Sequence, residues 1–316
     1  MLHDLSGAIL DAGDGEAAGR ACRALYDVLT RTSPFDGRVP GTRTDTGLAL
    51  APLLASHCLL DGPRTAAFAR AVLHAIRHAI GNAQRHAGRR PVEVVYAGTG
   101  PFAPLALLVM PHLEPGTAAF TLLDLHAESV DTVRGLIESF GLGEHVRDVV
   151  CADATRYRHP RPVDVLVSET MQRSLAEEPF VSIVRNFRPQ LSAAATIVPE
   201  RVTIHLVSLD APAQPSRWPA PFGGREPLGE VFHVQKEGET PGPVTLAVPY
   251  VPGSAAKWLA LETEVIAGNG TALAPYVSGL TEPEILWDCS PLTPGMTLAF
   301  HYDAGSRPGL RWRRME

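Results

Sequence analysis

The sequence lacks the features of a membrane protein, a secreted protein and a nucleic-acid-binding protein. None of its 316 residues belong to an apolar run of the roughly 18 or more that a spanning helix needs. The first residues, Met1–Asp4, lack the basic segment and apolar core of a signal peptide. The 28 Lys and Arg are outnumbered by 34 Asp and Glu, whereas a nucleic-acid-binding domain is expected to be basic. We therefore expect a cytoplasmic protein with no membrane or nucleic-acid partner.

Cysteine is scarce, and no pattern for metal binding is present. The four cysteines form no Cys-x-x-Cys pair and no zinc spacing; they are Cys22, Cys58, Cys151 and Cys289. This scatter favours reduced thiols in or near the core. His74 and His78 have a helical spacing that metals can use, but no third ligand is near them in the sequence. We expect no metal site, and the lack of a Gly-x-Ser-x-Gly motif argues against a hydrolase.

The composition predicts a folded chain with more than one part. Hydrophobic residues make up 45% and charged residues 20%, as in ordinary globular proteins, and 316 residues exceed what one core usually holds. Apolar residues recur at helical spacing over residues 5–31, 48–60 and 65–86, with a polar loop at 32–46. We expect an N-terminal helical cap over residues 1–90.

From residue 91 to 198, short β-branched runs alternate with helical stretches, as in βαβ units with a parallel sheet. The expected strands are Val92–Ala97, Ala119–Leu125, Val146–Cys151 and Val163–Ser168, and the expected helices are Ala103–Leu113, Glu128–Phe140 and Phe180–Phe187. Residues 199–316 contain successive strand-like segments without helices, which indicates an antiparallel β domain. The predicted fold class is α/β: a Rossmann-like core with a helical cap and a C-terminal β domain.

Three features of the core point to an adenosine ligand. Gly98-Thr99-Gly100 follows the first strand, where glycines let the backbone approach a ligand closely. Asp124 ends the second strand, where an acid can bind a ribose diol, and Asp153 follows the third, where it could meet an adenine amino group. No Gly-x-x-x-x-Gly-Lys-Ser/Thr motif or full dinucleotide fingerprint accompanies them. An adenosine without pyrophosphate predicts S-adenosylmethionine as the cofactor.

A pair of carboxylates follows the fourth strand. Glu169 stands at its carboxyl end, where α/β sheets bind ligands, and Glu178 comes nine residues later. A loop of this length can bring both carboxylates to one pocket, where each would raise the pKa of the other unless a cation lay between them. A guanidinium suits this place because it is planar, permanently charged and able to form bidentate contacts with carboxylates.

These motifs together resemble the protein arginine methyltransferase family. That family carries a Ser-Glu-x-Met loop with a second Glu nine residues after the first, and Ser168, Glu169, Met171 and Glu178 match it. A further match is the segment Asp61–Thr65, which is similar to the family's Asp-x-x-Arg-Thr. The similarity covers roughly residues 50–210.

The resemblance implies a role for each matching residue. Arg64 would hold the methionine carboxylate of S-adenosylmethionine, and S-adenosylhomocysteine would be the product. Glu169 and Glu178 would clamp the guanidinium, Glu178 or Asp61 would accept its proton, and the space around Met171 would set how many methyl groups are added. The expected cofactor-binding residues are Arg64, Gly98, Thr99, Gly100, Asp124, Leu125, Asp153, Ala154 and Glu169.

Two departures from the family pattern stand out, the first bearing on how the donor sits and the second on the substrate. The strand before the glycine turn contains the bulky Tyr96, and the C-terminal part lacks the Thr-His-Trp loop that helps the family bind protein arginine. We therefore expect a small guanidino substrate, free L-arginine in natural-product biosynthesis, as in stand-alone bacterial relatives. The alternatives are a protein arginine methyltransferase, a SAM-dependent lyase or cyclase, and a silent SAM-binding partner subunit. The family pairs through a helical arm, for which the Pro-rich residues of about 211–229 are the candidate for homodimer formation.

Overall fold

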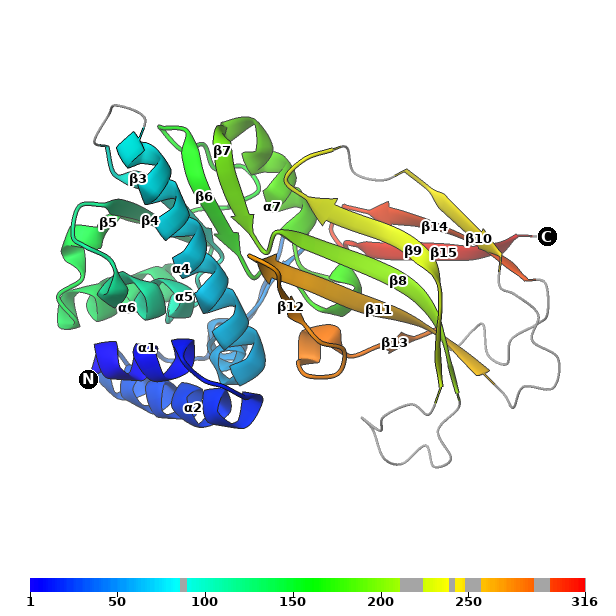
Figure 1. The fold of residues 1–316 in the computed structure, drawn as a ribbon, viewed down its shortest axis with the longest axis horizontal. Coiled ribbons are helices and arrows are strands. Elements are labelled where there is room, and N and C mark those ends of the chain that lie inside the picture. The colour runs from blue at the N-terminus through cyan, green and yellow to red at the C-terminus, as the bar shows by residue number, and fades with distance from the viewer. Residues whose placement is uncertain (86–89, 211–223, 239–241, 248–256, 287–295, 316) are drawn as a thin grey trace.

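A computed structural model of the chain describes residues 1–85, 90–210, 224–238, 242–247, 257–286 and 296–315. Figure 1 shows helices gathered around a twisted sheet on the N-terminal side and long antiparallel strands on the C-terminal side. The α/β fold class with a C-terminal antiparallel region is confirmed. Within the described residues, no helix combines the length and apolarity that crossing a membrane requires.

The N-terminal segment forms helices because its apolar residues follow helical spacing. The second helix buries Ala18, Cys22, Leu25 and Leu29 along one stripe. Asp14 begins this helix by accepting a hydrogen bond from the Ala17 amide at 2.7 Å. The continuous helical segment predicted for residues 5–31 is therefore two helices, separated by a turn. The helices of the cap are α1 (Leu2–Leu10), α2 (Gly15–Thr32), α3 (Pro52–His57) and α4 (Gly62–Arg85).

The core is a five-stranded parallel sheet in the order β5-β4-β3-β6-β7. Its strands are β3 (Val92–Ala97), β4 (Ala118–Asp124), β5 (Val146–Cys151), β6 (Val163–Ser168) and β7 (Leu191–Val198). The chain runs outward from β3 to β5 on one side and then continues from β6 to β7 on the other. The reversal lies between β3 and β6, and ligands of open α/β sheets bind at such a point, beyond the carboxyl ends of the strands.

Helices cover this sheet, and the described β strands of the C-terminal part pack against α4 and the loop after β6. The core helices are α5 (Pro104–Val109), α6 (Ala127–Ser139) and α7 (Phe180–Phe187). The C-terminal strands are β8 (Arg201–Asp210), β9 (Arg225–Gln235), β10 (Val244–Ala247), β11 (Lys257–Gly268), β12 (Thr271–Leu273), β13 (Glu284–Ile285), β14 (Thr297–Asp303) and β15 (Gly309–Met315). One apolar cluster includes Phe68 of α4, Phe120 of β4 and Phe300 of β14, so the parts share a core.

Some predicted features differ in the structure or lie outside its described part. The polar loop predicted for residues 32–46 contains one strand of a short antiparallel hairpin, β1 (Thr42–Arg43) with β2 (Leu48–Ala49). Cys22 is buried, but Cys151 is exposed at the end of β5, so the expectation of thiols in or near the core does not hold for it. Cys289 and most of the candidate arm, residues 211–223, lie outside the described residues.

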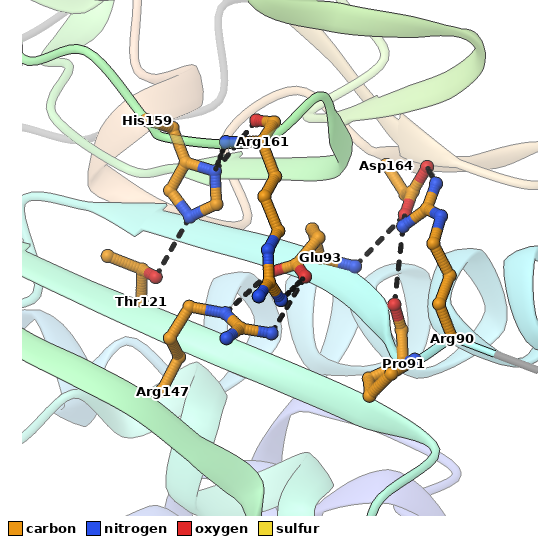
Figure 2. A network of polar contacts seen from close by, with 8 residues as sticks. All are labelled: Arg90, Pro91, Glu93, Thr121, Arg147, His159, Arg161 and Asp164. Carbon is orange, nitrogen blue, oxygen red and sulfur yellow. Dashed lines mark hydrogen bonds and ion pairs between the residues drawn. The ribbon is translucent and has the colours of Figure 1, made fainter.

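A buried ion cluster joins the strands at the amino end of the sheet, away from the ligand-binding edge. Figure 2 shows Glu93 of β3 between Arg147 of β5 and Arg161. Arg147 donates to the Glu93 carboxylate at 2.7 Å and Arg161 at 2.9 Å. Asp164 of β6 accepts a hydrogen bond from the Glu93 amide at 3.0 Å and forms an ion pair with Arg90 at 2.7 Å. Glu93 is only 1% exposed, so its charge depends on these arginines.

Candidate active site

A cavity opens at the reversal point between β3 and β6. It contains about 840 Å³ of space free of atoms, part of which is open to solvent. Small-molecule sites are concave and mostly apolar, with a few convergent polar groups, and this cavity has the same character. Its lining includes the predicted residues Arg64, Gly98, Thr99, Gly100, Asp124, Leu125, Asp153, Ala154, Glu169 and Glu178. Segments from five separate stretches of the sequence therefore meet around one space.

The glycine turn after β3 forms one wall of this cavity. Gly98 has a φ of +76°, and a Cβ placed there would lie 2.1 Å from the Thr170 side chain. Gly100 has a φ of +59°, and its amide donates to Asp124 at 2.8 Å. Both positions require glycine, since an L side chain is strained at these angles. The turn thus keeps its backbone close to the loop that follows β6.

Two acids stand beside this turn at the ends of β4 and β5. Asp124 is 7% exposed and accepts hydrogen bonds from the amides of Gly100 and His126. Asp153 accepts from the amide and hydroxyl of Thr155, at 2.8 and 2.7 Å. These bonds fix the direction of each carboxylate and leave acceptor capacity for a ligand.

The first of the paired carboxylates, Glu169, is held from two directions. Nε of Arg64 donates to Glu169 Oε1 at 3.1 Å, and the hydroxyl of Tyr96 donates to Oε2 at 3.2 Å. Nη2 of Arg64 also donates to the main-chain oxygen of Glu169 at 2.9 Å. Burial works against the charge of Arg64, but Glu169 raises its pKa above the usual value. Arg64 therefore stays charged and keeps further N–H groups for another anion.

The second carboxylate, Glu178, is 7% exposed and faces the same cavity. Burial raises its pKa to about 7, while Arg64 and a hydrogen bond with the Gln172 side chain act in the opposite direction. Desolvation disfavours the charged form of a carboxylate, and a cation alongside it would restore that charge. Glu178 is therefore suited to receive either a cation or a proton.

The loop between these glutamates turns back sharply to bring them together. Ser174, Leu175 and Glu177 have φ values of 57°, 52° and 63°, in the left-handed region that most residues avoid. The β strands hold this backbone: the Ser174 amide donates to Thr263 Oγ1 at 2.7 Å, and the Tyr302 hydroxyl donates to the Leu175 oxygen at 2.9 Å. The C-terminal part therefore fixes the conformation that aims the second carboxylate.

The hairpin β1–β2 covers the cavity, which the sequence did not predict. The Leu48 amide donates to the Glu177 oxygen at 2.7 Å, and Arg43 forms an ion pair with the Glu177 side chain at 2.6 Å. On the other side, the Thr46 hydroxyl donates to Thr155 Oγ1 at 3.3 Å. The hairpin thus connects the paired-glutamate loop with the Asp153 loop. The turn residues Asp45 and Gly47 are the sequence signal that could have revealed it.

Two predicted site residues do not line the cavity. Asp61 accepts hydrogen bonds from the Ser278 hydroxyl at 2.6 Å and from the Arg64 amide at 3.3 Å. Its carboxylate therefore connects α4 to the C-terminal part. Met171 is 2% exposed and packs in the core beside the loop. Among the residues the structure describes, no group of three His, Cys, Asp or Glu could hold a metal ion.

Comparisons with known proteins place this geometry in a known fold. The Trypanosoma brucei PRMT1 enzyme–prozyme heterotetrameric complex with AdoHcy is 13% identical, with a TM-score of 0.51, over 83% of this chain and 98% of that chain. An open conformation of Arabidopsis thaliana protein arginine methyltransferase 10 is 12% identical, with a TM-score of 0.50, over 78% and 95%. The chain has the fold of protein arginine methyltransferases. No protein-family model and no curated protein sequence matches it.

The residues expected to bind an adenosine ligand lie together at this cavity. Asp124 offers acceptors to a ribose, the glycine turn leaves no side chain in the way, and the buried charge of Arg64 faces the cavity beside it. Cys58 also lines this space, and burial raises its pKa, which keeps it a neutral thiol. The acids and Arg64 line the cavity together with Tyr96, His126 and several threonines.

Proposed function

We propose that this protein is an S-adenosylmethionine-dependent N-methyltransferase that methylates the guanidino group of a small molecule, with free L-arginine as the substrate. One observation carries the proposal: Glu169 and Glu178 face the same cavity as Asp124 and the glycine turn. A cation-binding pair therefore adjoins a nucleoside-binding wall. A methyl transfer to a guanidinium needs these two elements side by side.

On the donor side, Asp124 would bind the ribose, Asp153 the adenine amino group and Arg64 the carboxylate. The bound donor supplies a methyl group on a positively charged sulfur, ready for nucleophilic attack. Arg64 can hold the donor while its Nε stays on Glu169, since its Nη groups provide further donors. Donor binding to Arg64 would thus help to fix the Glu169 carboxylate, which binds the guanidinium of the acceptor.

On the acceptor side, Glu169 and Glu178 would grip the guanidinium and leave one terminal nitrogen facing the methyl group. Positioning of this kind can contribute roughly 7–11 kcal/mol to lowering a barrier. Glu178 would accept the proton after attack, because its carboxylate faces the cavity beside the bound guanidinium. Asp61, the other candidate for this step, lies outside the cavity and is engaged by Ser278.

The substrate class rests on the sequence, since no Thr-His-Trp motif is present in it. Methylation of arginine in proteins is the second candidate, and the names of the structural neighbours favour it. A single incubation separates the two. The protein with S-adenosylmethionine and L-arginine should yield S-adenosylhomocysteine and an arginine heavier by one methyl group. Methylation of protein alone would support the second candidate, and methylthioadenosine would indicate a lyase.

Substitution of the paired glutamates tests the mechanism. Glu169→Gln and Glu178→Gln should each lower kcat by about a hundredfold or more, because each removes a charge that orients the guanidinium. Binding of S-adenosylhomocysteine, measured by calorimetry, should survive in Glu178→Gln. Glu138→Gln is the control, since Glu138 is exposed on α6 and does not line the cavity. Near-normal turnover in Glu169→Gln would defeat the mechanism.

A further inference from the structure

Tyr96 lines the cavity and has no role yet in the proposed mechanism. It lies in β3, two residues before Gly98, and is 2% exposed. Its ring lines the cavity together with Arg64, Glu169 and Glu178. A phenol in such a buried place needs a hydrogen-bond partner, and it finds one in a carboxylate.

The hydroxyl of Tyr96 contacts Glu169 Oε2 at 3.2 Å. Burial, and then the nearby Glu169 charge, raise the pKa of Tyr96 well above its usual value. The phenol therefore keeps its proton and acts as a donor to the carboxylate. A hydrogen bond to a charged group is stronger than one between neutral groups.

This bond completes a two-sided grip on Glu169. Arg64 holds Oε1 from α4, and Tyr96 holds Oε2 from β3, so rotation of the carboxylate would break one contact or the other. Each carboxylate oxygen has two lone-pair sites, so one remains on each oxygen after these bonds form. The free sites are the ones available to a ligand in the cavity.

We propose that Tyr96 is a positioning residue, which fixes the plane of the Glu169 carboxylate so that its free lone pairs meet the guanidinium of the acceptor. This role rests on the proposed methyl transfer. It predicts that loss of the phenol hydroxyl lowers the rate of methyl transfer to the acceptor. The affinity for the donor, which is bound by Asp124 and the glycine turn, should change little. A catalytic constellation depends on such support, because small misplacements of a reacting group lower the rate strongly.

Tyr96→Phe keeps the ring and removes only the hydroxyl. We expect kcat with L-arginine to fall by about tenfold to a hundredfold, in line with loss of a hydrogen bond to a charged group. The Kd of S-adenosylhomocysteine should stay within about twofold of wild type, since its contacts are unchanged. If the hydroxyl had a purely structural role, its removal would lower the melting temperature and change both kcat and the Kd of S-adenosylhomocysteine.

Tyr276→Phe is the matched control. It also removes a phenol bond to a buried carboxylate, the 3.0 Å contact with Glu262, but neither residue lines the cavity. Its kcat should stay within about twofold of wild type. Wild-type turnover in Tyr96→Phe, or an equal loss in both variants, would overturn the role of Tyr96.

A second readout tests the contact without turnover. In protein with tyrosine labelled by ¹³C at Cζ, the Tyr96 resonance is the one lost in Tyr96→Phe. It should move in Glu169→Gln, because the phenol then faces an uncharged acceptor. An unmoved resonance would overturn the proposal. A wild type that methylates no guanidino compound would instead overturn the proposed function, and with it the part of Tyr96 in that reaction, whatever the resonance does.

Discussion

At the scale of single residues, the burial of Glu178 links stability to pH. Its pKa rises from 4.5 to about 7 in the folded protein, chiefly because of burial. Between these values the folded state keeps a proton that the unfolded chain has released. The free energy of unfolding therefore falls as the pH rises through this range and levels off above it, by roughly 3 kcal/mol in total.

Glu178→Gln should remove this dependence, because glutamine is uncharged at every pH. The variant should gain melting temperature relative to wild type between about pH 5 and about pH 8. Thermal unfolding followed by circular dichroism measures the difference. Glu138→Gln, on the exposed side of α6, is the control and should show no such gain. A difference between Glu178→Gln and wild type that is equal at both pH values would refute the burial effect.

The raised pKa of Glu178 also predicts that this residue releases a proton when the substrate binds. A guanidinium beside Glu178 would favour its charged form and lower its pKa. Binding of L-arginine below about pH 7 should therefore release a proton, and its affinity should rise with pH through this range. Calorimetry in buffers of different ionisation enthalpy detects the proton. Affinity that is constant from about pH 5 to about pH 8 would contradict this expectation.

Sequence reasoning reached residues that belong to ordered motifs and missed those that depend on tertiary contacts. Asp124 was found because it ends a strand, Glu169 because it directly follows one, and Glu178 because of its spacing from Glu169. All three line the cavity. Asp61 was expected beside them, but Ser278, distant in the sequence, takes its carboxylate. No local pattern reports such a partner.

At the scale of elements, the glycine turn should be sensitive to a single methyl group. In Gly98→Ala, a φ of +76° and a Cβ 2.1 Å from Thr170 would force the turn and the loop after β6 apart. We expect the Kd of S-adenosylhomocysteine to rise by at least about tenfold. Calorimetry measures this directly.

Gly116→Ala provides the control for this substitution. Gly116 has the same φ of +76°, but nothing lies within 4 Å of its added Cβ. It should lose about 1–2 kcal/mol of stability through backbone strain, with donor affinity unchanged. If Gly98→Ala bound S-adenosylhomocysteine as tightly as Gly116→Ala, the turn would not form part of the donor site.

The strands of the core were predictable because β-branched runs mark them. Val92–Ala97, Val146–Cys151 and Val163–Ser168 agree with the structure in both bounds. The edge strand β7 was missed, since Ser192 and three alanines weaken its strand pattern. The hairpin β1–β2 was missed because its two-residue strands are stabilised by contacts with Glu177 and Thr155 rather than by their own sequence.

At the scale of the whole molecule, the ion cluster around Glu93 should support the fold without serving the reaction. Glu93→Gln would weaken the hydrogen bonds that a buried carboxylate accepts from Arg147 and Arg161. Because both arginines are partly exposed, we expect a cost of about 1.5–3 kcal/mol, as for hydrogen bonds to a charged group. We expect a lower free energy of unfolding in urea and a kcat close to wild type. Asp131→Asn breaks an exposed pair with Arg134 and should change stability by less than about 1 kcal/mol. Equal stability of the two variants would contradict this role.

The division into a cap, a core and a C-terminal β domain at about residues 90 and 198 stays a prediction, as does the homodimer. The structure does show how the parts cooperate at the cavity. α4 contributes Arg64, the core sheet contributes the acids and the glycine turn, and the C-terminal strands hold the paired-glutamate loop through Thr263 and Tyr302.

The central claim is that Glu169 and Glu178 hold a guanidinium against the adenosyl donor. A crystal structure with S-adenosylhomocysteine and L-arginine tests it most directly. We predict the ribose at Asp124 and the guanidinium between the two carboxylates, within hydrogen-bond distance of both and facing the sulfur. An arginine bound elsewhere, or a donor product outside the wall formed by Asp124 and the glycine turn, would contradict the claim.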